Sequence, residues 1–144
     1  MTTRRLRILG LETSCDETSV ALLDVHGKLP KSSVRLVKHA VSSQIDIHAK
    51  YGGVVPEVAA RTHVAEVVSL LTSALEDRGA IHRAPLDQFD AIAVTRGPGL
   101  ATALRVGIQA AQTLAWLSGK PIIGVNHLEG HLASAWLLPE NRRK

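Results

Sequence analysis

The stretch "LRILGLETSCDETSVALLDV", Leu6–Val25, decides the fold of this 144-residue chain. It contains two short apolar runs rich in strand-forming residues, Leu6–Glu12 and Ser19–Val25, which flank the polar connector Thr13–Thr18. Runs of this length, joined by turn-forming residues, predict two adjacent antiparallel strands. We expect a third strand at Val34–Ser42, so the chain begins with a β-meander.

Helix and strand signals alternate after the meander. Residues Gln44–Val55 show little periodicity and include two glycines, which predicts a loop. Pro56 suits the first turn of a helix, and Gly79 suits its C-terminal end. An apolar stripe with 4-3-4 spacing supports this helix and consists of Val64, Val68, Leu71 and Leu75.

The second half of the chain repeats the alternation. Asp90–Gly99 is expected to be a buried strand that ends in a glycine turn, and Pro121–His127 a strand covered on both faces. A helical stripe between them ends at Gly119, and Leu128–Leu138 also has a helical pattern. The order β-β-β-α-β-α-β-α therefore predicts a single α/β domain with a mixed sheet and helices on both faces. The stripe between the strands consists of Leu100, Leu104, Ile108, Ala111 and Ala115.

The composition limits the class of protein. Hydrophobic residues make up 45% of the chain but aromatic residues only 3%, which predicts an aliphatic core. The net charge of +4 is compatible with a nucleic-acid partner, although basic tails at both ends are the simpler interpretation. The single cysteine, Cys15, excludes a disulfide within one chain and fits a reducing compartment. Because no window approaches about eighteen apolar residues, we expect no membrane span and a cytoplasmic protein.

Two histidines, His127 and His131, are candidate metal ligands. Residues four apart on a helix share a face, so both imidazoles can reach one metal ion. Glu129 lies two residues after His127, so the motif is not the H-E-x-x-H of zinc proteases. Without an identifiable third ligand, spacing alone favours two histidines on a helix surface. Their place at a strand-to-helix junction, where α/β folds put their active sites, favours a functional role.

A glycine turn precedes the second long helix, in the stretch "RGPGLATALRVG" (Arg96–Gly107). Gly97 and Gly99 approach a helix N-terminus, whose free backbone N–H groups can bind an anion. Thr102 stands where a dinucleotide fingerprint has its third glycine, and no Walker A lysine follows. A tight structural turn and a phosphate-binding turn are therefore equally compatible with the pattern.

Two further polar segments are compatible with chemistry. The connector Glu12–Ser19 carries three acids among hydroxyl and thiol groups, which can surround a phosphate or a metal-bound water but also form an ordinary turn. The local pattern favours the turn, and no base that would activate Cys15 can be identified. The loop at His48–Glu57, together with His63, offers more polar groups but no recognisable reaction.

Four segments together resemble one family: "ILGLETSCDETSVALLD", "SSQIDIHAKYGGVVPEVAARTH", "AVTRGPGLATALRVG" and "GVNHLEGHLASA". They look like the N-terminal half of the TsaD-type tRNA N6-adenosine threonylcarbamoyltransferases, formerly named glycoproteases. They occur in family order and cover most of residues 7–137. The resemblance implies the fold of the actin, Hsp70 and sugar-kinase superfamily, which has two ribonuclease-H-like lobes. Residues 1–144 would form the N-terminal lobe, and we expect the second lobe to be absent.

The resemblance also implies a reaction. The family transfers the threonylcarbamoyl group of threonylcarbamoyl-AMP to N6 of adenosine 37 in tRNAs that read ANN codons. His127 and His131 match the family's two metal-ligand histidines, and the ion is expected to be iron rather than zinc. The family's third ligand, an aspartate, lies in the second lobe. Glu12 and Asp16 lie on the first phosphate-side loop and are the candidate catalytic residues, and the glycine turn would lie on the nucleotide side.

The implied partners are tRNA, a TsaB-like paralogue and a TsaE-like ATPase. The segment Lys28–Val41 is longer than in the family, which makes the limits of the third strand uncertain. Family members are more than twice as long as this chain, so we expect the chain alone to be inactive and to bind metal weakly. An alternative is a non-catalytic scaffold lobe that pairs with a catalytic homologue. The two histidines favour the catalytic branch, because a scaffold needs no metal ligands.

Overall fold

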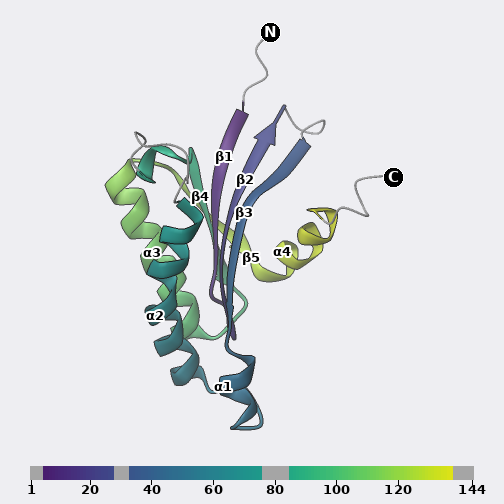
Figure 1. The fold of residues 1–144 in the computed structure, drawn as a ribbon, viewed down its shortest axis with the longest axis vertical. Coiled ribbons are helices and arrows are strands. Elements are labelled where there is room, and N and C mark those ends of the chain that lie inside the picture. Colours follow the sequence, from purple (N-terminus) through teal and green to yellow (C-terminus); the bar gives the residue numbers. More distant parts are fainter. Residues whose placement is uncertain (1–4, 28–32, 76–84, 138–144) are drawn as a thin grey trace.

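The computed structural model describes residues 5–27, 33–75 and 85–137. They form one five-stranded mixed sheet in the order β3-β2-β1-β4-β5 (Figure 1). The first three strands are antiparallel, whereas β1, β4 and β5 run parallel to one another. The strands are β1 (Arg5–Glu12), β2 (Glu17–His26), β3 (Ser33–Ser43), β4 (Ala91–Gly97) and β5 (Ile122–Asn126). The helices are α1 (Ile45–Ala49), α2 (Pro56–Leu75), α3 (Ala101–Ser118) and α4 (His127–Ser134), with 3-10 turns η1 (Pro85–Asp87) and η2 (Ala135–Leu137).

The predicted β-meander is confirmed, with one change at the connector. Leu9 pairs with Leu22 and Glu12 with Ser19 across β1 and β2, as the two apolar runs require. Glu17 and Thr18 were expected in the connector but begin β2 instead, because their backbones pair with the end of β3. The connector is therefore only four residues long, which holds the end of β1 close to the start of β2.

Helices cover the sheet from two sides, as expected. Figure 1 shows α2 and α3 on one side of the sheet and α4 on the other. α2 packs on β2 and β3, α3 packs on β4, and the two helices also contact each other. Gly119 ends α3 with φ 66°, the left-handed conformation that glycine adopts without strain. Asn126 caps α4, because its side chain accepts hydrogen bonds from the N–H groups of Leu128 and Glu129.

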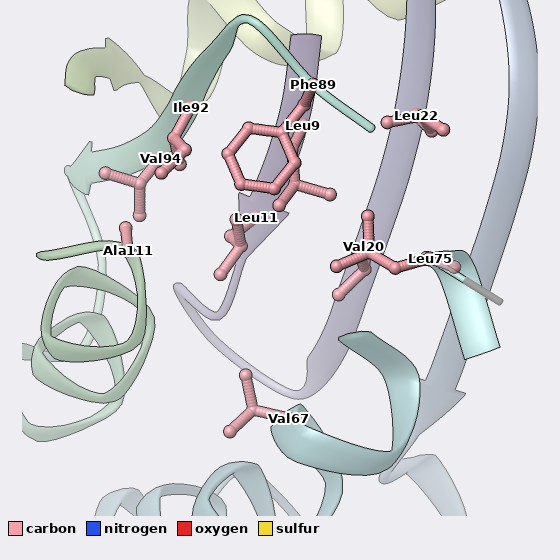
Figure 2. Packing of buried hydrophobic residues seen from close by; sticks show 11 residues of the cluster. Leu9, Leu11, Val20, Leu22, Val67, Leu75, Phe89, Ile92, Val94 and Ala111 are labelled. Carbon is pink, nitrogen blue, oxygen red and sulfur yellow. The ribbon is translucent and has the colours of Figure 1, made fainter. Parts of the chain in front are cut away.

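The core lies between the sheet and the α2–α3 layer. Alternate residues of β1 and β2 point into it, because side chains of a strand alternate between its faces. The core is aliphatic as predicted, except for Phe89, the only phenylalanine of the chain and the largest fully buried side chain among the described residues (Figure 2). The cluster consists of Leu9, Leu11, Val20, Leu22, Val67, Ala74, Leu75, Phe89, Ile92, Val94 and Ala111.

For the segment between β3 and the end of α2, one prediction is wrong and a second is wrong for half of its residues. Part of the expected loop forms the short helix α1, which is held by buried hydrogen bonds and is too short to produce a periodic pattern. In α2, Val64 and Val68 are 62% and 67% exposed and lie outside the core, whereas Leu75 is buried in it and Leu71 packs against it, as predicted. In place of Val64 and Val68, the buried residues are His63 and Val67, each one position earlier. The predicted end of this helix at Gly79 lies outside the described residues.

The strand β5 is also more exposed than predicted. Its continuous apolar run suggested cover on both faces, but it is an edge strand of this sheet and, among the described strands, pairs with β4 alone. Ile122 and Ile123 are 40% and 52% exposed. The apolar run in the sequence predicts a strand here, but it does not predict which neighbouring elements cover the faces of that strand. No helix within the described ranges is long and apolar enough to cross a membrane.

Candidate metal centre

The parallel strands β1, β4 and β5 bring their carboxyl ends to one edge of the sheet. Glu12 ends β1, Thr95 lies near the end of β4, and His127 follows β5 directly. In open α/β sheets, this edge is where ligands bind. The candidate site therefore forms where three strands that are distant in sequence meet.

The helix α4 places the two histidines together. The Nε2 atoms of His127 and His131 are 3.0 Å apart, and the rings meet edge to face with centroids 4.4 Å apart. Nitrogen atoms at this separation can both bind one ion, because metal–imidazole bonds are about 2.0–2.1 Å long. His127 is half-buried whereas His131 is exposed. The donor type and the spacing of these two side chains therefore suit a divalent metal.

Glu12 and Ser14 hold His127 from the other side of its ring. The Nδ1 atom of His127 lies 3.1 Å from Oε2 of Glu12 and 3.0 Å from Oγ of Ser14. Thr95 donates its hydroxyl to the same Oε2 at 2.6 Å, and the Ser14 N–H donates to Oε1 of Glu12. Burial raises the pKa of Glu12, but the hydrogen bonds from Thr95, Ser14 and His127 outweigh it and lower the pKa below its usual value.

Asp16 and Cys15 are neighbours in the connector between β1 and β2. The backbone C=O of Asp16 accepts a hydrogen bond from the N–H of Gln44 at 2.9 Å, and no described contact joins its carboxylate to His127 or His131. Burial raises the pKa of the Cys15 thiol, and the neighbouring Asp16 raises it further. A nucleophilic cysteine needs the opposite shift, so Cys15 is a poor candidate.

The glycine turn packs against the connector. The N–H of Leu100 donates to the C=O of Ser14 at 2.8 Å. Gly99 permits this contact, because a Cβ at this position would lie 2.7 Å from the same oxygen. Gly97 has φ 144°, which side chains rarely permit. The turn thus has a defined packing role, and anion binding by Gly97 and Gly99 stays a prediction.

A buried polar cluster supports the connector from the opposite side. The Nε2 atom of His63 is 3.1 Å from the C=O of Cys15, and its Nδ1 atom is 2.7 Å from Oγ of Thr18. Gln44 contacts both His63 and His48. Burial lowers the pKa of His63, so the ring is neutral and each nitrogen has a definite partner. These histidines are structural, and they do not join the site at α4.

Sequence reasoning missed Thr95 and the roles of Ser14. Thr95 is the only polar side chain in the run "AIAVT", and it stands at the carboxyl end of a buried strand. That position was a usable signal, because a hydroxyl there points toward the edge where α/β sites form. Ser14 gave no separate signal, since hydroxyl residues are common in turns.

The described part of the chain does not complete a metal site by itself. It contains no group of three or more His, Cys, Asp or Glu side chains placed to hold an ion. Structural and catalytic zinc sites normally use at least three protein ligands. The two imidazoles therefore fit a metal in chemistry and spacing, and a third ligand is not among these residues.

Comparison with known proteins gives one consistent result. Residues 35–143 match the family model described as tRNA N6-adenosine threonylcarbamoyltransferase, TsaD. A curated enzyme of that name from Synechococcus sp. (strain JA-3-3Ab) is 51% identical over 138 residues, which is 96% of this chain and 37% of the relative. One from Anaeromyxobacter dehalogenans (strain 2CP-1) is 50% identical over 91% of this chain and 36% of its own length. The chain thus spans little more than a third of these relatives.

Solved structures support the fold. YeaZ from Pseudomonas aeruginosa is 27% identical, with a TM-score of 0.52 over 94% of this chain and 49% of that chain. RuvC from Thermus thermophilus has the same TM-score of 0.52 at 17% identity, over 83% of this chain and 63% of its own, and shows the fold alone. These likenesses confirm the α/β, ribonuclease-H-like lobe predicted from the sequence.

Proposed function

The chain belongs to the tRNA N6-adenosine threonylcarbamoyltransferase family, and we propose that it forms the part of this enzyme that carries two ligands of a metal ion. The reaction would transfer the threonylcarbamoyl group from threonylcarbamoyl-AMP to N6 of adenosine 37 in tRNAs that read ANN codons. The observation that carries the proposal is the 3.0 Å separation between the Nε2 atoms of His127 and His131 at the carboxyl edge of the sheet.

The residues of this lobe would have different roles in the reaction. His127 and His131 would hold one divalent ion, iron rather than zinc, and Glu12 would orient His127. The ion would supply Lewis-acid chemistry to the carbamoyl carbonyl when bound. Asp16 and the glycine turn before α3 are candidates for the adenylate side, since a helix N-terminus with free amides suits a phosphate. The third ligand would come from the part of the family that this chain does not span.

The proposed partners follow from the family and from two observations. A tRNA substrate suits the net charge of +4 and would place the protein in the cytoplasm. A TsaB-like paralogue is supported by the likeness to YeaZ and by the exposed apolar residues Val64 and Val68 of α2 and Trp116 of α3. A TsaE-like ATPase is proposed from the family alone.

A non-catalytic scaffold lobe is the second candidate function. The likeness to YeaZ and the exposed helix residues would suit it equally well. A scaffold, however, has no need for a carboxylate that holds one histidine and a second histidine that faces the first. The arrangement of Glu12, His127 and His131 therefore favours the catalytic lobe.

A chimaera tests the proposed function. The matching segment of the Synechococcus relative would be replaced by this chain, and transfer of threonylcarbamoyl to tRNA would be measured with threonylcarbamoyl-AMP. We expect the chimaera to be active. Its His127→Ala and His131→Ala variants should transfer threonylcarbamoyl to tRNA about 100-fold more slowly or worse. The control His39→Ala removes an exposed histidine of β3 and should change activity less than about twofold.

The same assay separates the two candidates. If His127→Ala and His131→Ala keep the activity of the chimaera, the metal-ligand proposal is wrong and the scaffold function is favoured. The 144-residue chain alone is expected to give only background modification. Circular dichroism of each variant would show that a loss of activity is not a loss of fold.

A further inference from the structure

We propose that Glu12 is a positioning residue that fixes His127 as the Nδ1–H tautomer, and that His131 changes its tautomer when a metal binds. This inference rests on the proposed metal site and assigns unequal roles to its two histidines. It concerns where one proton lies on each ring, which the contacts around the rings determine.

The contacts of Glu12 determine the proton on His127. Oε2 of Glu12 accepts the hydroxyl proton of Thr95 at 2.6 Å and lies 3.1 Å from Nδ1 of His127. The hydroxyl of Ser14, 3.0 Å from Nδ1, can donate or accept, but an ionised carboxylate has no proton to donate. An unprotonated Nδ1 would therefore place two acceptors, Nδ1 and Oε2, against each other. Both oxygens of Glu12 accept protein donors, the N–H of Ser14 and the hydroxyl of Thr95, as an ionised carboxylate does. Nδ1 therefore carries the proton, and the lone pair of His127 is on Nε2.

Thr95 and Ser14 keep Glu12 in this position. The N–H of Ser14 donates to Oε1 while the hydroxyl of Thr95 donates to Oε2, so both carboxylate oxygens have a donor from the protein. Thr95 is buried and lies in β4, where backbone pairing to β5 fixes it. The carboxylate cannot rotate away from His127 without losing one of these hydrogen bonds.

The proton on His131 follows from that on His127. Their Nε2 atoms are 3.0 Å apart, which is a hydrogen-bond distance. Because Nε2 of His127 has only a lone pair, Nε2 of His131 must carry a proton and donate it in the metal-free protein. A metal ion needs the lone pairs of both Nε2 atoms.

Metal binding therefore requires His131 to lose its Nε2 proton and to take one on Nδ1. The number of protons on the two rings stays the same, and water exchanges them because His131 is exposed. Within the described ranges, no contact is seen for Nδ1 of His131, so nothing there opposes the change. The Nε2 lone pair of His127 is thus available before the metal binds, whereas His131 has to change its tautomer to bind the metal.

The test is ¹⁵N NMR of the histidine rings in the purified chain, without metal and with Zn²⁺, which reads the tautomer of each ring directly. In the wild type we expect His127 to be Nδ1–H in both states and His131 to change from Nε2–H to Nδ1–H with Zn²⁺. Glu12→Gln should shift His127 toward Nε2–H, because a carboxamide has one acceptor oxygen for three donors. Its Zn²⁺ affinity should fall about 10- to 100-fold, as for other outer-shell partners of metal ligands.

Two further variants sharpen the test. Thr95→Val removes the hydroxyl and should weaken the preference of His127 for Nδ1–H, and Thr95→Ser should restore it. Glu57→Gln removes an exposed carboxylate of α2 and is the matched control, with no change in either tautomer. These variants also keep the inference testable if Glu12→Gln fails to fold.

The outcomes separate this inference from the proposed function. Nε2–H at His127 in the metal-free wild type, or an unchanged His127 in folded Glu12→Gln, would overturn the role of Glu12. The expected metal-free tautomers combined with no response of His131 to Zn²⁺ would overturn the tautomer change and the metal site, while the role of Glu12 would stand.

Discussion

Gly99→Ala is expected to destabilise the protein by forcing the glycine turn away from the connector. A Cβ at position 99 would lie 2.7 Å from the C=O oxygen of Ser14 and 2.8 Å from its Cβ. Carbon–oxygen contacts need about 3.3 Å or more, so the turn would have to move by about 0.6 Å. The oxygen it meets belongs to the backbone and already accepts the N–H of Leu100 at 2.8 Å.

The size of the effect follows from three contributions. Overpacking a tight contact costs about 1–3 kcal/mol, and loss of the Leu100–Ser14 hydrogen bond costs about 1 kcal/mol. The alanine lowers the conformational entropy of the unfolded chain, and this offsets about 0.4–1 kcal/mol of the destabilisation. We therefore expect Gly99→Ala to lower the free energy of unfolding by about 1–3.6 kcal/mol.

Equilibrium urea denaturation of the purified chain measures this change. Gly53→Ala is the matched control, because a Cβ at Gly53 meets nothing within 4 Å. The control should equal or slightly exceed the stability of the wild type, with similar m-values for all three proteins. A Gly99→Ala variant as stable as Gly53→Ala would refute the argument that the turn needs glycine to reach Ser14.

Two further predictions concern the core and the opposite end of the sheet. Phe89→Ala removes the largest side chain that is fully buried in the described ranges and should lower the free energy of unfolding by about 3–5 kcal/mol, measured in the same urea titration. Asp24 is fully buried beside Arg5, Arg7 and Arg35, and hydrogen bonds led by that from Arg7 hold the pKa of its carboxyl well below its usual range despite burial. A carboxyl whose pKa is lower in the folded protein than in the unfolded chain stabilises the fold at pH values above its unfolded pKa of about 3.9. This stabilisation is lost as the pH falls toward the folded pKa. Asp24→Asn should therefore lower the free energy of unfolding by about 2–3 kcal/mol at pH 7. This is less than for a fully buried ion pair, because Arg5 and Arg35 are partly solvated. The difference in free energy of unfolding between the variant and the wild type should shrink below about pH 4. A constant difference between pH 7 and pH 3 would show that Asp24 acts through packing instead.

The sequence predicts the parts of the fold that depend on local pattern. The two apolar runs around the connector pair as expected, since alternation in a half-buried strand fixes its register. Gly119 ends α3 because a left-handed residue is needed there. The spacing of His127 and His131 correctly places them on one face of a helix, with their Nε2 atoms 3.0 Å apart.

The sequence predictions fail for features of the fold that tertiary contacts determine. Val64 and Val68 of the α2 stripe were wrongly predicted to be buried, because His63, a polar residue, occupies a buried position that an apolar pattern does not count. The helix α1 depends on the buried hydrogen bonds of Gln44 and His48, which no local pattern shows. The role of Thr95 depends on its distance from Glu12, a residue 83 positions away in the chain.

Zinc binding to the histidine pair tests the central claim most directly. Isothermal titration of the purified chain with Zn²⁺ would compare the wild type with His127→Ala, His131→Ala and the double variant. If both side chains bind one ion, the wild type takes up one Zn²⁺ weakly, each single variant loses this binding, and the double variant loses no more than either. Binding that survives either single substitution, or losses that add up in the double variant, would contradict the claim that His127 and His131 form one metal centre.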